Sequence, residues 1–205
     1  MSEAVVNGGV PGWFGKMPNL GDFASRRLPD GFVHRWDSWL QSGMAEARDD
    51  LTQDWLAGYL VAPIHRFWLA PGLLGEAGWA GLLMPSVDRV GRHFPLTLAQ
   101  PLAALDAALA ARDWYASLDT VARQVLDVHF TVDDLERALA GLADAPPARL
   151  DDAARRLAQR LLDGGDGAAA RSVWWCDDAR EAARFDCYAE LPSPSALAAM
   201  LGARR

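Results

Sequence analysis

Lysine is nearly absent from this sequence of 205 residues. Lys16 is the single lysine among 20 basic residues, and 27 acidic residues leave a formal net charge of −7 at pH 7. A protein that binds nucleic acid needs clustered cations to neutralise phosphates. The charge balance therefore argues against nucleic acid as the main partner.

Long apolar runs are also missing. No stretch reaches the roughly 18 consecutive apolar residues of a membrane-spanning helix. The first residues, MSEAVVNGGVPGWFG, contain no basic start followed by an apolar run, which a secretory signal would require. We therefore expect a cytoplasmic protein that does not insert into a membrane.

Cysteine is scarce, and the two thiols are not placed to pair. Cys176 and Cys187 flank a predicted hairpin with its centre near Arg180. This register sets Cys176 opposite Arg184 and Cys187 opposite Val173, so the two sulfur atoms do not face each other. The sequence predicts free cysteines.

Half of the sequence is hydrophobic, and its nine tryptophans supply both core residues and candidate interface anchors. The length suits one core, and we expect a single domain over residues 1–205 with residues 1–10 as a disordered tail. A helix is predicted from Asp30 to Arg48, because its apolar residues recur at helical spacing and Asp30 is a good N-cap. Trp36 and Trp39 lie on its apolar face.

The remaining elements place helices between strands. A short helix is expected near residues 49–59, and further helices at residues 113–128, 131–143, 150–165 and 193–202, with a connector at residues 145–148. Strands are expected at residues 11–16, 58–69, 79–85, 93–100, 171–176 and 184–190. Because strands at both ends of the sequence enclose the helices, we predict an α/β fold. Its central sheet is largely antiparallel or mixed and is flanked by helices as an α-β-α sandwich.

The usual catalytic and cofactor motifs are missing. The stretch GKMPNLGDF fails as a phosphate-binding loop, because Val10 stands where the first glycine belongs and Met17 follows the lysine. The four histidines lack metal-ligand spacing, so we predict no metal and no cofactor. Ser86, Asp88 and His93 lie close together in sequence, but the serine is not in the sharp glycine-flanked turn typical of a nucleophile. A hydrolase built on these three residues is the alternative function; the preferred interpretation assigns no catalytic residue.

Polar residues instead gather in two blocks. The first has the sequence GWFGKMPNLGDFASRRLP at residues 12–29 and is followed by FVHRWDSWLQ at residues 32–41. The second, GLLMPSVDRVGRHFPLTLA, occupies residues 81–99. In this order, with WLAGYLVAPIHRFWLAPG between them, the blocks resemble the TagF family of accessory proteins of the bacterial type VI secretion system. The resemblance covers roughly residues 11–102.

The resemblance implies an α/β sandwich and a regulatory role instead of catalysis. TagF-like proteins act in the cytoplasm as post-translational repressors of secretion assembly and are thought to engage a forkhead-associated scaffold protein. They oppose a regulatory pathway of the secretion system that is driven by threonine phosphorylation. Some members are fused to a metal-dependent phosphatase domain. The 205 residues leave no room for such a domain, so a phosphatase or kinase partner is expected to be a separate chain.

We expect the two blocks to meet and form one partner-binding surface. Gly15, Gly21 and Gly91 are expected to permit turns, with Gly91 at positive φ. Asp22 is predicted either to accept amide hydrogen bonds from the residues after it or to pair with an arginine of the second block. The predicted partner-binding residues are Lys16, Asp22, Ser25, Arg26, Ser86, Asp88, Arg89 and Arg92.

Overall fold

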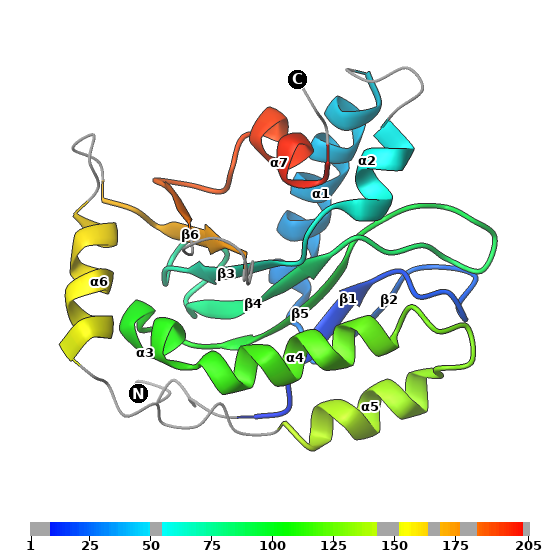
Figure 1. Ribbon diagram of the computed structural model, residues 1–205, viewed down its shortest axis with the longest axis horizontal. Helices are drawn as coiled ribbons and strands as arrows, with labels where there is room; N and C mark the ends of the chain where they lie inside the picture. The colour runs from blue at the N-terminus through cyan, green and yellow to red at the C-terminus, as the bar shows by residue number, and fades with distance from the viewer. Residues whose placement is uncertain (1–8, 50–54, 143–151, 164–168, 177–183, 203–205) are drawn as a thin grey trace.

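The structure, a computed structural model, describes residues 9–49, 55–142, 152–163, 169–176 and 184–202 (Figure 1). Most of the predicted N-terminal tail, the start of the helix at residues 49–59, the connector at residues 145–148 and the hairpin tip near Arg180 lie outside these residues. Those four expectations stay predictions.

A single seven-stranded sheet forms the centre of the molecule. Its strand order is β2-β1-β5-β4-β3-β6-β7, and every neighbouring pair is antiparallel. The strands are β1 (Gly12–Gly15), β2 (Ala24–Arg26), β3 (His65–Leu69), β4 (Trp79–Met84), β5 (Leu96–Pro101), β6 (Ser172–Trp175) and β7 (Phe185–Tyr188).

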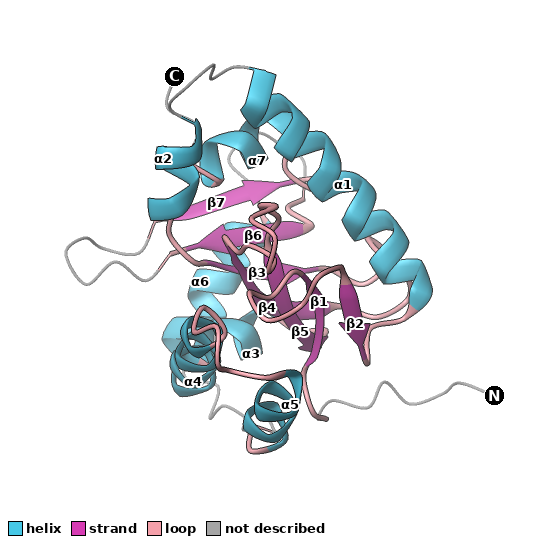
Figure 2. Ribbon diagram, turned by 90° about the vertical axis from the view of Figure 1, so that its right-hand side faces the viewer, coloured by secondary structure: helices cyan, strands magenta, loops and turns pink. Residues whose placement is uncertain are grey.

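Helices cover both faces of this sheet (Figure 2). One face carries α1 (Asp30–Asp49), α2 (Trp55–Val61) and α7 (Pro194–Met200). The other carries α3 (Leu105–Ala110), α4 (Arg112–Gln124), α5 (Val132–Ala140) and α6 (Asp152–Leu162). None of the described helices combines the length and apolar composition needed to cross a bilayer. The predicted α-β-α sandwich in a single domain is confirmed.

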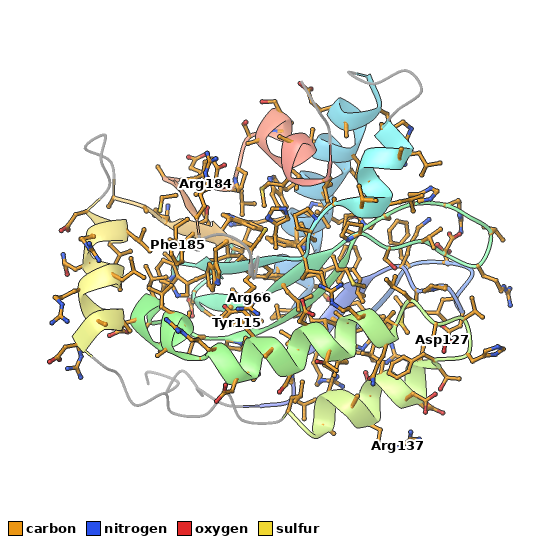
Figure 3. All side chains as sticks on the ribbon, viewed as in Figure 1. Arg66, Tyr115, Asp127, Arg137, Arg184 and Phe185 are labelled. Atoms are coloured by element: carbon orange, nitrogen blue, oxygen red, sulfur yellow. The ribbon has the colours of Figure 1, made fainter. Side chains whose placement is uncertain are left out.

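Two hydrophobic cores follow from the alternation of side chains along each strand. On β1, Trp13 packs into the core beneath α3–α6, whereas its neighbour Phe14 packs into the core beneath α1 and α7. The first core also takes in a charged side chain. The guanidinium of Arg66 on β3 lies 5.3 Å from the ring centre of Tyr115 on α4 (Figure 3).

Helix α1 confirms the predicted amphipathic segment. Trp36 and Trp39 are both buried against the sheet, with ring centres 4.6 Å apart. Farther along, α1 passes close to α7: a Cβ added to Gly43 would lie 2.4 Å from the Leu197 side chain. Glycine at this position therefore lets the two helices approach each other.

The hairpin register is also confirmed, because Val173 pairs with Cys187. Other expectations need correction. The predicted strand at residues 58–69 is wrong over its first part, where residues up to Val61 form α2 and β3 begins only at His65. Pro63 lies between the two elements, since proline lacks the N–H that either would use. Strand β2 and helix α3 were not predicted.

Candidate functional site

The first sequence block reaches the second at the end of β1. Gly15 has φ of +137°, and a Cβ there would lie 2.2 Å from the carbonyl oxygen of Pro95. A side chain at this position would therefore push the two segments apart. The following turn is closed by a hydrogen bond from the N–H of Leu20 to the oxygen of Met17, 2.9 Å long.

The second block forms a tight hairpin between β4 and β5. Val87 and His93 form an antiparallel bridge, and the N–H of Asp88 donates to the oxygen of Arg92 at 3.0 Å. Gly91 at the tip has φ of +84°, which confirms the predicted positive value. The hairpin thereby turns the Asp88 carboxylate inward.

That carboxylate is the centre of the junction between the blocks. Its Oδ2 accepts from Lys16 Nζ at 2.8 Å and from Arg92 Nε at 2.6 Å. Its Oδ1 accepts from the backbone N–H groups of Val90 and Arg92, at 3.0 and 2.9 Å. The Asp88 side chain is fully buried and that of Lys16 is 5% exposed. This ion pair therefore joins two segments that are 72 residues apart in sequence.

Two opposing effects act on the pKa of Asp88. Burial alone would raise the pKa, but hydrogen bonds from the Lys16 ammonium and from the backbone and side chain of Arg92 outweigh burial. The pKa of Asp88 is therefore held well below its ordinary value of 3.8. The carboxylate is ionised at neutral pH and balances the buried charge of Lys16.

Ser86 and Tyr59 add buried hydrogen bonds to the junction between the two blocks. The Ser86 hydroxyl donates to the carbonyl oxygen of Lys16 at 2.8 Å. The Tyr59 hydroxyl donates to the Ser86 carbonyl and accepts from the Ser86 N–H, each at 2.9 Å. Burial raises the pKa of Tyr59 above its ordinary value. Sequence analysis missed Tyr59, because it lies where the predicted helix at residues 49–59 and the predicted strand at residues 58–69 overlap, outside both blocks.

Asp22 follows the first of its two predicted alternatives. Its Oδ1 accepts from the N–H of the next residue, Phe23, at 2.8 Å. The acidic residue that holds Arg92 is Asp88, so the expectation that Asp22 would do so is wrong. The two blocks nevertheless meet there: the Arg89 N–H donates to the Leu20 oxygen at 2.9 Å.

Ser25 and Arg26 lie beside the junction, on edge strand β2. Ser25 is half-buried opposite Phe14, and Arg26 is exposed opposite Trp13. The guanidinium of Arg26 donates to the carbonyl oxygen of Ser25 at 3.0 Å. Neither side chain contacts the Asp88 carboxylate among the contacts of the described residues.

A third loop joins the two blocks at the same end of the molecule. The side-chain amide of Asn19 donates to the carbonyl oxygen of Phe130, in the connection between α4 and α5, at 2.8 Å. Asp127 of this connection lies at the end where the loops gather (Figure 3). We refer to residues 17–23, 86–93 and 125–130 together as the three-loop surface.

Large apolar side chains project from all three loops. Their exposed fractions are 44% for Phe23, 65% for Val90, 47% for Leu126 and 62% for Val128. Arg89 is exposed among them, and the described residues form no ion pair with its guanidinium. Apolar side chains next to an unpaired cation are typical of a protein-interaction surface.

The geometry does not assemble a hydrolase site from Ser86, Asp88 and His93. The Ser86 hydroxyl donates to a backbone oxygen and the Asp88 carboxylate binds Lys16 and Arg92. The His93 ring packs edge-on against Trp55 and Tyr59. Within the described parts of the chain, no hydrogen bond joins His93 to either residue. Burial, followed by the charge of Arg48, lowers the pKa of His93.

Comparison with known proteins finds a family model and a solved structure that are similar to this chain. The family model described as TagF N-terminal domain, type VI secretion system-associated, matches residues 12–142. The crystal structure of PA0076 from Pseudomonas aeruginosa PAO1 is similar over 95% of both chains, with 37% sequence identity and a TM-score of 0.79. No curated protein matches the chain.

Proposed function

Because the chain belongs to the TagF family of type VI secretion-associated proteins, we propose that it represses secretion assembly after translation, by binding a protein partner in the cytoplasm. The proposed partner is the forkhead-associated scaffold protein of the secretion system. A separate-chain phosphatase or kinase of the same regulatory arm is the second partner proposed. Family membership favours a non-enzymatic accessory protein, and the bonding of Ser86 agrees with that.

The three-loop surface is the proposed binding site, and the buried Asp88 junction is the observation that supports it. The junction holds together loops that are far apart in sequence. The exposed side chains of these loops are therefore preorganised and lose little conformational freedom on binding. Lys16, Ser86 and Asp88 are buried. In this proposal they position the loops and do not touch the partner.

The exposed residues of the predicted set are the proposed contacts. Asp22, Arg26, Arg89 and Arg92 are exposed, whereas Ser25 is half-buried at the edge. Arg92 also donates to Asp88 and to the carbonyl oxygen of Gly21. An exposed guanidinium can bind a partner carboxylate or phosphate through two parallel hydrogen bonds. Arg89 is therefore the clearest candidate for a direct contact.

We expect Arg89→Ala to weaken binding to the purified scaffold protein by about tenfold or more, because a charge contact in a desolvated interface is lost. Titration calorimetry measures the dissociation constant. The variant should keep the parent's circular dichroism spectrum and fail to repress secretion when overproduced. Arg92→Ala should also weaken binding, but it additionally removes a donor to Asp88 and should lower stability.

Arg112→Ala is the matched control, since Arg112 is an exposed arginine at the start of α4, away from the three loops. It should bind and repress as the parent does. If Arg89→Ala also binds and represses like the parent, Arg89 is not a contact and the site assignment fails. Failure of every variant, the parent included, to bind the scaffold would instead reject the proposed partner.

The apolar rim provides a second test. Val90→Ser and Val128→Ser should each weaken scaffold binding several-fold, because each removes apolar area from an interface. Val61→Ser is the control: Val61 is 73% exposed but lies on α2, outside the three-loop surface. An equal effect of all three substitutions would mean that the loss is not specific to this surface.

A further inference from the structure

Cys176 and His65 form a pair on the opposite side of the sheet from α4, and the proposed function does not use them. His65 begins β3, and the register that pairs Arg66 with Trp175 sets His65 directly across from Cys176, the residue after β6. The thiol sulfur lies 3.1 Å from His65 Nδ1 and 3.9 Å from Nε2. Nδ1 is therefore the nitrogen that faces the sulfur.

A third group fixes the orientation of the imidazole. His65 Nε2 lies 2.9 Å from the carbonyl oxygen of Met200, at the end of α7. A carbonyl oxygen can only accept, so Nε2 carries the proton and Nδ1 presents its lone pair to the thiol. The thiol contacts the base, and the base contacts an acceptor that orients it, which is the set of contacts around an activated nucleophile.

Burial and charge keep His65 in the form that can accept a proton. His65 is 8% exposed, and burial lowers its pKa below the ordinary value, while the Met200 carbonyl and the charge of Asp186 act in the opposite direction. The imidazole is therefore neutral at pH 7. Cys176 itself is half-buried, so part of this residue reaches solvent.

We propose that Cys176 is a peroxide-sensitive thiol and that His65 is the base that activates it. As the sulfur attacks one peroxide oxygen, its proton passes to His65 Nδ1 and the O–O bond breaks. The leaving hydroxide takes that proton and becomes water. Sulfur loses two electrons and becomes a sulfenic acid, and hydrogen peroxide is reduced by the same two electrons. This inference is independent of the three-loop surface.

Cys187 provides an internal control on the neighbouring strand. It is exposed, but partial desolvation and, after it, the charge of Asp186 raise its pKa. Access alone would make Cys187 the faster thiol, whereas activation by a base would make Cys176 faster. A faster Cys176 would therefore exclude access alone as the explanation. Because the raised pKa of Cys187 also slows that thiol, the role of His65 is tested by its own variant.

The test treats the full-length protein with hydrogen peroxide at pH 7, traps sulfenic acid with dimedone and follows each cysteine by mass spectrometry. Trypsin places the cysteines in separate peptides, residues 172–180 and 185–204. Cys176 should react about tenfold faster than Cys187 in the folded protein. In concentrated urea the two rates should become similar.

His65→Gln keeps a polar side chain of similar size but removes the base. This substitution should lower the rate of sulfenic acid formation at Cys176 by about tenfold or more, because the general base is removed. The rate at Cys187 should stay unchanged. The proposal is overturned if Cys187 reacts as fast as Cys176 in the folded parent, or if a folded His65→Gln variant leaves the Cys176 rate unaltered. If that variant loses the native circular dichroism spectrum, the test rests on whether Cys176 reacts faster than Cys187 in the folded parent.

Discussion

Asp88→Ala should lower the free energy of unfolding by about 3–5 kcal/mol, because it leaves the buried Lys16 ammonium without its counter-charge. The same substitution removes the acceptor of Arg92 Nε and of two backbone N–H groups. Urea unfolding followed by tryptophan fluorescence measures the change. The large cost comes from the groups that remain, since each buried donor keeps its desolvation penalty without a hydrogen bond.

A partly exposed aspartate on the surface of α4, with a side chain 25% exposed, gives the matched control. Asp119 forms an i,i+4 pair with Arg123, whose side chain is 65% exposed, and Asp119→Ala should cost only about 0.5 kcal/mol or less. Adding Lys16→Met to Asp88→Ala should recover part of the stability by removing the unpaired charge. Equal urea midpoints for Asp88→Ala and the parent would show that the junction does not stabilise the fold.

The same ion pair predicts how stability depends on pH. The pKa of Asp88 is lower in the folded state than in the unfolded state, so the unfolded state takes up a proton first as pH falls. The contribution of Asp88 is therefore fully present well above pH 4 and is lost progressively below it. The urea midpoints of the parent and of Asp88→Ala should differ at pH 7 and approach each other toward pH 3. A difference that stays constant over this range would contradict the prediction.

The sequence predicted the elements whose pattern is local. Helix α1 was found from the recurrence of Phe32, Trp36 and Leu40 at helical spacing. The β6–β7 register followed from the symmetry of the hairpin, as the pairing of Val173 with Cys187 confirms. In both cases the residues that define the element lie close together in sequence, so periodicity and turn position were sufficient.

Elements that depend on distant partners were missed. The apolar run YLVAPIHRFWL has no periodicity that separates the end of α2 from β3, and only packing decides between helix and strand there. Strand β2 is a polar segment of three residues, and it forms because β1 offers it a free edge. Neither outcome can be obtained from local composition.

The candidate site was also only partly predictable from the sequence, because it depends on contacts between distant residues. Sequence analysis offered Asp22 as one possible link between the two blocks, but the carboxylate that joins them is Asp88. The pairing of β1 with β5, strands separated by most of the first half of the chain, brings Lys16 to Asp88 in the middle of the second block. The α4–α5 loop was not predicted to take part, although Leu126 and Val128 are apolar residues beyond the regular part of a helix. Their exposure was the signal that only the structure could provide.

Trp36→Ala should also cost about 3–5 kcal/mol, as for other fully buried aromatic side chains. Trp36 is completely buried and its ring contacts those of Phe32, Trp39, Phe67 and Trp174, with centres 4.6 to 6.0 Å apart. Its indole N–H donates to Thr97 Oγ1 on β5 at 2.7 Å. Replacement by alanine therefore leaves a cavity between α1 and the sheet and removes the hydrogen bond to Thr97.

Two further variants separate these contributions. Trp36→Phe keeps an aromatic ring but cannot donate to Thr97, so it should cost clearly less than Trp36→Ala, with about 1 kcal/mol of the loss due to the hydrogen bond. Leu60→Ala, at a position 62% exposed on α2, should leave the urea midpoint nearly unchanged. If Trp36→Ala also leaves the midpoint unchanged, this face of α1 does not stabilise the core. Its tryptophans would then be available to a partner, and the binding site would have to be sought on α1 in place of the three-loop surface.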